Sequence, residues 1–421
     1  MKKREKFHLK MENNFSKILD FFSKTFKTDV SYVIKGSFWW VFGRLISFFA
    51  SFLILFFFSR LASKEVYGAY QYIISLCAIF SILTLPGLDT ALVRAVAQKK
   101  ERTFFLCEKE KLKFGLILFL VLSSISGYYF FKKNFELGLG FLFGGIFLPF
   151  LSIFSLYIAF WQGRQRFDLQ NKYFALHNLL ASLIFVSILI LKPTIVFSAF
   201  AFYFSFTLAT FLFWLKTKKE INKNSEEDKE TLSFGKHLTL MYFPQALSQQ
   251  LDYVLLWHFV GPKAVAIYTF SLRVIERLGE LIPFSTLALP KMAQKDITKI
   301  KKSIFEKFLK LFPIAILIFL AYYFFAPILY QIFFPNYTES IFYSRIFAIF
   351  LLTSPFWFLS TALVAGQKKK ELYIINFVSQ GLKILLYSIL IPFFGIWGGI
   401  ISVLSFYFIS SFLTLYFFKK I

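Results

Sequence analysis

The chain alternates between long apolar stretches and short polar connections. The apolar stretches occupy approximately residues 38–61, 68–96, 114–131, 139–161, 174–191, 194–215, 236–259, 264–290, 308–330, 343–366, 373–391 and 394–417. An apolar helix needs about 20 residues to cross the hydrocarbon core of a bilayer, and these stretches have approximately that length. The pattern therefore predicts an all-α polytopic membrane protein with about 12 transmembrane helices.

Lysine and arginine are distributed unevenly among the connections. Of the 48 Lys and Arg residues, 36 lie at the two ends of the chain and in every second connection. Cytoplasmic segments of membrane proteins are enriched in these residues, so we expect both termini to be cytoplasmic, in the inner membrane of a bacterium. The net charge of +25 then marks the face beside anionic lipid and not a nucleic-acid-binding surface.

Composition supports a membrane protein, because 57% of the residues are hydrophobic. The polar and charged first 35 residues lack the apolar region of a signal peptide, so the first transmembrane helix is expected to act as an uncleaved signal. The two cysteines, Cys77 and Cys107, fall in the second helix and in a cytoplasmic connection. A structural disulfide is not expected from that placement.

The chain is predicted to divide into two lobes. Residues 1–37 form a cytoplasmic N-terminal segment, 38–215 an N-lobe of six helices, 216–236 a flexible, charged cytoplasmic linker, and 237–421 a C-lobe of six helices. The two halves have weak sequence similarity to each other: Lys64 to Tyr70 resembles Lys263 to Tyr268, and Gly163 to Arg166 resembles Gly366 to Lys369. Because each half has an even number of helices, the lobes would be related by a pseudo-twofold axis along the membrane normal.

Catalytic features are missing from the pattern. The external connections are short, the four histidines are scattered, and we find no nucleophile elbow, phosphate-cradling loop or metal-ligand spacing. We therefore expect no enzyme activity, no catalytic residues, no cofactor and no metal site.

Ionisable residues at membrane depth are functional candidates because they are costly to insert. In the eighth helix Arg273, Glu276, Arg277 and Glu280 are spaced by three, one and three residues, which places them on one face. These charges are interpreted either as a transport pathway or as a self-paired ladder that only lowers the cost of insertion.

The seventh helix has a second polar stripe with the same spacing, formed by Gln245, Ser248, Gln249 and Asp252. The two stripes are expected to face one aqueous cavity.

Other membrane charges leave two interpretations open. Arg44 and Arg94 either line the cavity or extend to the headgroups. Asp89 follows Pro86 and Gly87, which should break the second helix, so Asp89 either binds a ligand or caps the broken segment.

The charges predicted within the membrane are six basic and four acidic residues. The basic residues are Arg44, Arg94, Arg273, Arg277, Arg345 and Lys383, and the acidic residues are Asp89, Asp252, Glu276 and Glu280. A cationic interior favours an anionic headgroup, while the carboxylates are candidates for H⁺ or Na⁺ coupling.

Several segments together resemble the polysaccharide-transporter-type oligosaccharide flippases, relatives of lipid II flippases and multidrug exporters in one superfamily. These segments are Ser59 to Tyr70, Gly87 to Arg94, Asp252 with Gly261 to Arg273, and Leu289 to Lys291. The resemblance implies two six-helix lobes in a V around a central cavity, and alternating access that moves a polyprenyl-diphosphate-linked oligosaccharide from the inner to the outer leaflet.

The resemblance also places two cavity arginines of the family at Arg44 and Arg273, whereas Arg277, Glu276 and Glu280 follow only from helix geometry. Ala266 departs from the glycine frequent in the family before Ile-Tyr. Membrane lipids and polymerase or ligase proteins are the partners that such a function implies.

Two other functions remain as alternatives. A cation-coupled multidrug exporter of the same superfamily is opposed by the basic interior. A membrane oligosaccharide polymerase or glycosyltransferase is opposed by the short external connections, which leave little room for a catalytic site.

Overall fold

The computed structural model describes residues 30–279, 292 and 297–420, and only the backbone of residues 30–42, 44, 277–279 and 298. All regular secondary structure in these residues is helical. Within them, nine helical segments are long and apolar enough to cross a membrane, and the apolar segment Leu45–Leu61 is a shorter candidate. The protein is a multi-pass, all-α membrane protein, which confirms the predicted fold class.

The predicted apolar stretches coincide with helices, several of which are broken. Seven stretches each contain one continuous helix: α2 (Val30–Leu61), α5 (Thr103–Phe131), α8 (Phe167–Leu191), α9 (Ile195–Glu220), α14 (Ile297–Phe333), α17 (Lys369–Phe394) and α18 (Ile396–Lys420). Four are divided: α3 (Lys64–Phe80), η1 (Ser81–Thr84) and α4 (Gly87–Ala97); α6 (Phe135–Phe154) and α7 (Leu156–Gly163); α10 (Glu230–Ser248) and α11 (Leu251–Phe259); and α15 (Ser340–Phe347), η3 (Ala348–Thr353) and α16 (Ser354–Ala365). The stretch 264–290 begins with α12 (Pro262–Gly279), and its remainder lies outside the described residues.

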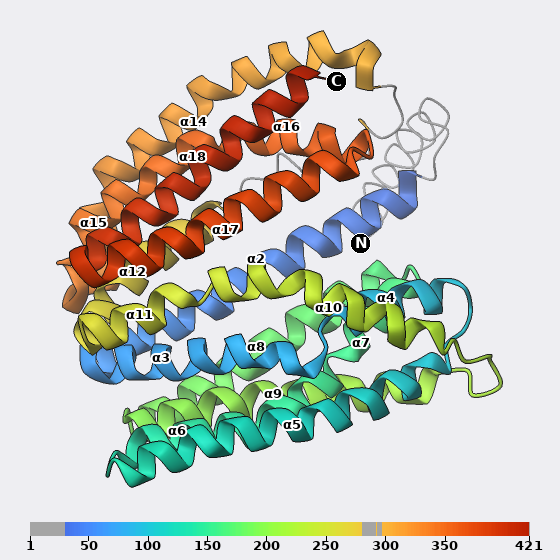
Figure 1. The fold of residues 1–421 in the computed structure, drawn as a ribbon, viewed down its shortest axis with the longest axis horizontal. Coiled ribbons are helices and arrows are strands. Elements are labelled where there is room, and N and C mark those ends of the chain that lie inside the picture. Colours follow the sequence, from blue (N-terminus) through green and yellow to red (C-terminus); the bar gives the residue numbers. More distant parts are fainter. Residues whose placement is uncertain (1–29, 280–291, 293–296, 421) are drawn as a thin grey trace, which may run out of the picture.

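The helices form two lobes arranged as a V (Figure 1). We call α2–α9 the N-lobe, and α11, α12 and α14–α18 the C-lobe. The lobes meet near α3, α11, α12 and α15, and they diverge toward the end where both described chain ends lie (Figure 1). We call these the narrow end and the wide end of the molecule.

The two lobes share a turn at corresponding places. At the wide end, Gln165 between α7 and α8 and Gln367 between α16 and α17 both have left-handed backbone, with φ of 58° and 52°. In each turn the backbone N–H of the next residue donates to a carbonyl five residues earlier. Arg166 donates to Trp161 and Lys368 to Leu363, both at 3.0 Å. This repeat agrees with the sequence similarity between the halves, although it aligns Arg164, and not Gly163, with Gly366.

The predicted break at Pro86 is present. Leu85 adopts a left-handed conformation with φ of 57°, and α4 begins at Gly87. A β-carbon at Gly87 would lie 2.2 Å from the carbonyl oxygen of Gly235, so only glycine allows α4 and α10 to approach this closely. The backbone N–H of Gly87 also donates to the hydroxyl of Thr239, at 3.0 Å. These contacts pack α10 against the N-lobe.

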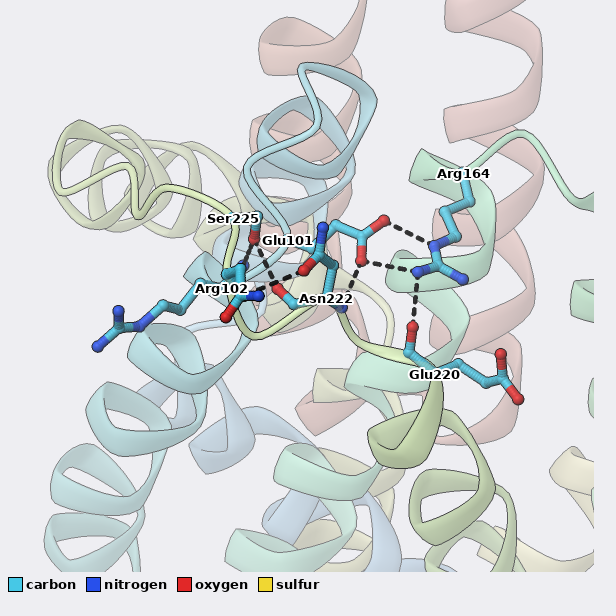
Figure 2. Close-up of polar contacts among 7 residues, drawn as sticks. Glu101, Arg102, Arg164, Glu220, Asn222 and Ser225 are labelled. Carbon is cyan, nitrogen blue, oxygen red and sulfur yellow. Dashed lines mark hydrogen bonds and ion pairs between the residues drawn. The ribbon is translucent and has the colours of Figure 1, made fainter.

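The connection between α9 and α10 differs from the flexible linker expected over residues 216–236. Helix α9 continues to Glu220 and α10 begins at Glu230, so only nine residues lie between them. Figure 2 shows how this connection is fixed: Arg164 forms two 2.7 Å bonds to the Glu101 carboxylate and one of 2.6 Å to the Glu220 carbonyl. The same carboxylate accepts from the Asn222 N–H at 2.9 Å. We call Glu101, Arg164, Glu220 and Asn222 the clasp.

The narrow end is closed by contacts between the lobes. A β-carbon at Gly68 on α3 would lie 1.9 Å from the Pro262 carbonyl oxygen at the start of α12, so the two backbones touch. Beside this crossing, Tyr67 packs against Phe270, with ring centroids 4.9 Å apart. Two exposed ion pairs flank the contact, Lys64 with Glu339 at 3.0 Å and Lys263 with Glu65 at 3.2 Å.

Candidate functional site

A buried carboxylate lies where α11, α12 and α17 meet. Asp252, in the first turn of α11, is 2% exposed. Its carboxylate accepts hydrogen bonds from the hydroxyls of Tyr268 on α12, at 2.8 Å, and Tyr387 on α17, at 3.1 Å. It also accepts from the backbone N–H of Tyr253, at 3.0 Å. Three donors therefore hold Asp252 in one position inside the C-lobe.

Lys383 supplies the opposite charge. It lies on α17, one turn before Tyr387, and interacts electrostatically with Asp252 and Glu276. Its ammonium nitrogen lies over the rings of Tyr387 and Phe406, 5.3 and 5.1 Å from their centroids. Aromatic faces stabilise a cation that has left water. We call Asp252, Tyr268, Tyr387 and Lys383 the Asp252 cluster.

The charged face predicted on the eighth helix is present at Arg273 and Glu276. Arg273 Nη1 lies 3.7 Å from Glu276 Oε2, and the two side chains are 31% and 33% exposed. The guanidinium also lies over the ring of Tyr253, 5.8 Å from the centroid. Among the described residues one pair of the predicted ladder is thus formed, and it is long and partly exposed.

The polar stripe on the seventh helix is divided by the break between α10 and α11. Ser248 and Asp252 are buried, and the Ser248 hydroxyl donates to the side-chain carbonyl of Gln380 on α17. Gln245 and Gln249, in contrast, are exposed. Ser248 therefore joins the buried part of the stripe to α17.

Asp89 in the N-lobe is the partner of a buried lysine. Lys111 on α5 is 1% exposed, and its ammonium lies 2.8 Å from Asp89 Oδ1. Lys111 also donates to the hydroxyl and carbonyl oxygens of Ser152, at 3.0 and 3.2 Å. Helix α4 has no side-chain cap at its first turn, so the capping interpretation of Asp89 is not the one observed.

Arg94 lies at the wide end, in a cavity of about 490 Å³ between α4 and α10. Its guanidinium is 5.5 Å from the ring centroid of Phe234. The cavity is also lined by Asp228, Glu230 and His237. Among the contacts of the described residues, none joins Arg94 or Asp89 to the Asp252 cluster, so the predicted site residues do not form one group.

Three candidates cannot be compared with the structure. The side chains of Arg44 and Arg277, and the whole of Glu280, lie outside the described residues; the backbones of Arg44 and Arg277 belong to α2 and α12.

Sequence reasoning missed the tyrosines and the glutamine that complete the site. Tyr268 and Tyr387 are hidden among 21 tyrosines, most of which could serve as ordinary packing residues. A signal was present on α17, because Gln380, Lys383 and Tyr387 are spaced by three and four residues and share one helix face. Lys111 was also missed as a membrane charge, since it lies within a basic cluster assigned to the cytoplasm.

Comparison with solved structures identifies the class of fold. An inward-facing multidrug resistance MATE family transporter of the MOP superfamily aligns with a TM-score of 0.63 and 15% identity, over 89% of this chain and 94% of that chain. The lipid II flippase MurJ, in an inward closed conformation, aligns with a TM-score of 0.67 and 14% identity, over 92% and 87%. A MOP superfamily transporter from Pyrococcus furiosus, described as having a binding pocket of reverse polarity, aligns with a TM-score of 0.62 and 15% identity, over 92% and 95%. The chain thus has the fold of the MOP superfamily transporters.

Comparison with protein families is more specific. The sequence profile of the polysaccharide biosynthesis protein family matches residues 33–282, more than half of the chain. The chain belongs to this family, which confirms the resemblance found in the sequence. A search among curated proteins found no match.

Proposed function

We propose that the protein is a flippase that moves a polyprenyl-diphosphate-linked oligosaccharide from the inner to the outer leaflet of the bacterial cytoplasmic membrane, for cell-surface polysaccharide biosynthesis. Membership in the polysaccharide biosynthesis family supports the class of substrate. The observation that carries the proposal is the partly exposed side chain of Arg273, whose guanidinium lies 3.7 Å from the Glu276 carboxylate.

Such a substrate needs a cationic path through the membrane. A diphosphate and a polar glycan are costly to transfer into hydrocarbon, because water is lost without replacement. Arginine can replace that water with two parallel, charge-assisted hydrogen bonds to phosphate oxygens. In this proposal Arg273 binds the diphosphate, and Lys383 adds positive charge on the neighbouring α17. The prenyl tail stays in lipid.

In alternating access, the narrow end of the V would open while the wide end closes. The narrow end is closed by the contact of Gly68 with Pro262. With both termini in the cytoplasm, this arrangement admits substrate from the inner leaflet, and rocking of the lobes would open the narrow end to the outer leaflet. Asp252 is the proposed coupling group for H⁺ or Na⁺, because a change in its charge would alter its bonds to α12 and α17 together. No chemical bond is made or broken, so the protein acts as a transporter and not as an enzyme.

Translocation in proteoliposomes tests the proposal. The probe is a fluorescent polyprenyl-diphosphate oligosaccharide, followed by loss of inner-leaflet accessibility, and the variants are Arg273→Gln and Arg345→Gln. Arg345 is a matched control, since its guanidinium also lies over a tyrosine, 4.6 Å from the Tyr323 centroid, but outside the Asp252 cluster. We expect Arg273→Gln to abolish transport and Arg345→Gln to retain it. Normal transport by Arg273→Gln would exclude this arginine from the mechanism.

A cation-coupled multidrug exporter is the second candidate. A fully buried carboxylate surrounded by aromatic rings, as at Asp252, would also suit a lipophilic cation or its coupling ion. Growth with lipophilic cations distinguishes the two functions: resistance that rises with expression and is lost in Asp252→Asn would favour the exporter.

A further inference from the structure

A second basic site lies at the wide end, between the start of α14 and the end of α18. It is a pocket of about 460 Å³, within the range of small-ligand sites. Its lining consists of four lysines and two phenylalanines: Lys299, Lys301, Lys302, Lys419, Phe305 and Phe418. We call it the α14–α18 pocket. None of these residues belongs to the proposed transport site.

The positive charge of this pocket is not balanced by the residues that line it. Among its described lining residues there is no carboxylate. Lys301 donates to the Lys419 carbonyl at 2.7 Å, which joins α14 to α18 beside the pocket.

A basic pocket in the N-lobe provides a contrast. That pocket, of about 390 Å³, contains Arg164 and Arg166, and both are paired with acidic side chains, Glu101 and Asp168. Both arginines of the N-lobe pocket are thus paired with carboxylates from nearby, and Glu220 lines the pocket, whereas no ion pair among the described residues involves a lysine of the α14–α18 pocket. An anionic ligand is therefore favoured at the second site.

The walls of the α14–α18 pocket are apolar and continue toward the membrane. Phe418 is buried and Phe305 is half-buried. Within two turns of the pocket on the same helices, Leu309, Phe412 and Tyr416 are exposed by 50%, 67% and 45%. The lysines lie at the ends of two candidate membrane spans, Lys299–Phe333 and Ile396–Lys420. The ends of membrane spans lie near the phospholipid headgroups.

We propose that the α14–α18 pocket binds the phosphate headgroup of an anionic phospholipid, whose acyl chains lie along the exposed apolar side chains of α14 and α18. Free phosphate would contact the same lysines but would gain nothing from the apolar surface. A bound lipid would hold the end of α18 against the start of α14, and so stabilise the wide end of the C-lobe. The site does not depend on the identity of the transported substrate.

The test compares two pairs of lysines on the same helix. Lys299→Gln/Lys302→Gln removes two charges from the pocket, while the control Lys307→Gln/Lys310→Gln removes two exposed lysines with the same spacing from outside it. Delipidated protein in detergent is titrated with dioleoylphosphatidylglycerol or dioleoylphosphatidylcholine, and bound lipid is counted by native mass spectrometry. Each lysine near an anionic surface contributes about 1 kcal/mol, so we expect the pocket variant to bind phosphatidylglycerol at least about tenfold more weakly.

The control variant should bind phosphatidylglycerol as the wild type does, and phosphatidylcholine should bind weakly to all three proteins. Equal binding by both double variants would overturn the proposal, as would equal binding of the two lipids. Displacement of the lipid by millimolar inorganic phosphate would also overturn it, since the site would then be one for a soluble anion. Thermal unfolding of both variants verifies that they fold, and a pocket variant that is folded yet binds normally contradicts the assignment.

Discussion

At the scale of single residues, the sequence identified charges but not their partners. Asp252 and Lys383 were both predicted as membrane charges, yet 131 positions separate them and no local pattern relates α11 to α17. Their association depends on how three helices pack, which a helix-by-helix prediction does not contain. The tyrosine donors were unpredictable for the same reason, because a tyrosine becomes a ligand of Asp252 only when its helix is in place.

The losses of stability on removing Asp252 and on removing Lys383 should not be additive. Asp252→Asn or Lys383→Met removes the attraction between the two charges, and residues in one polar network are coupled by about 0.5–3 kcal/mol. The double variant should lose less than the sum of the single losses. Denaturant unfolding in detergent measures this coupling, and strictly additive losses would mean that the two charges do not interact.

Lys111 should be the least replaceable lysine of α5. The side chain of Lys111 is 1% exposed, and its ammonium lies 2.8 Å from Asp89. The side chain of Lys113 is 62% exposed, and its contact with Glu110 is longer, at 3.5 Å. We expect Lys111→Met to destabilise the N-lobe by about 3 kcal/mol or more, and Lys113→Met by less than about 1 kcal/mol. Thermal unfolding followed by size-exclusion chromatography compares them, and similar midpoints would contradict the structural role of Lys111.

At the scale of helices, apolar length predicted every segment, but breaks were predicted only where the sequence marks them. Pro86 and Gly87 mark the break before α4. The break between α10 and α11 was missed, because no glycine or proline lies between Ser248 and Leu251. This break follows from packing: α10 lies against α4 of the N-lobe, while α11 is bonded to α12 and α17. The ordered connection before α10 was missed too, since charged composition alone suggested flexibility.

The crossing of α3 and α12 should tolerate no side chain at position 68. A methyl group there would overlap the Pro262 carbonyl, so Gly68→Ala must separate the two helices. Gly127→Ala on α5 is the control, because no atom lies within 4 Å of its added carbon. We expect Gly68→Ala to lower the unfolding temperature and to increase labelling of a cysteine placed at Tyr67, while Gly127→Ala does neither. Equal labelling in both backgrounds would show that the crossing does not seal the narrow end.

The hydrogen bonds of the clasp should break in acid, when the Glu101 carboxylate takes up a proton. Burial raises the pKa of Glu101, but the hydrogen bonds from Arg164 and the Asn222 N–H, with the charge of Arg164, lower it more, so its pKa lies below the ordinary 4.5. A lowered pKa means that the stabilisation is complete above the unfolded-state value and is lost as pH falls through the folded-state value.

Fluorescence anisotropy of a dye on a cysteine at Lys223 can follow this release. We expect the anisotropy to stay high through neutral and mildly acidic pH and to fall only below 4.5. In Glu101→Gln the anisotropy should be low throughout and should lack this transition. A transition near neutral pH would assign the release to another group.

At the scale of the whole molecule, the V follows from unequal contact between the lobes. Their contacts concentrate at the narrow end, where Gly68 meets Pro262 and where Lys263 and Glu65 form an exposed pair. The resemblance to the flippase family implied this V, whereas the apolar pattern predicted two halves of six helices and not the angle between them. Which end of the V is closed was not predictable, because the sequence pattern does not specify how closely the two lobes approach at either end.

Cross-linking the narrow end should stop transport reversibly. In Glu65→Cys/Lys263→Cys, a short bis-methanethiosulfonate reagent would form a disulfide with each cysteine, releasing methanesulfinate, and so join α3 to α12 and prevent that end from opening. Cys77 and Cys107 are buried, so they should react little. Transport should cease on cross-linking and return on reduction, while Glu65→Cys alone should be unaffected by the reagent. Continued transport by the cross-linked protein would refute opening at this end.

The packing of α10 has a consequence for protein engineering. The clasp and the contact of Gly87 with Gly235 attach α10 to the N-lobe, although the chain order assigns it to the second half. A chimera of two homologues joined within residues 221–229 would therefore pair one parent's α4 with the other parent's α10 and mismatch that interface. A junction at Gln249 or Gln250, in the break between α10 and α11, would keep the α4–α10 interface within one parent and is the better place to recombine such proteins.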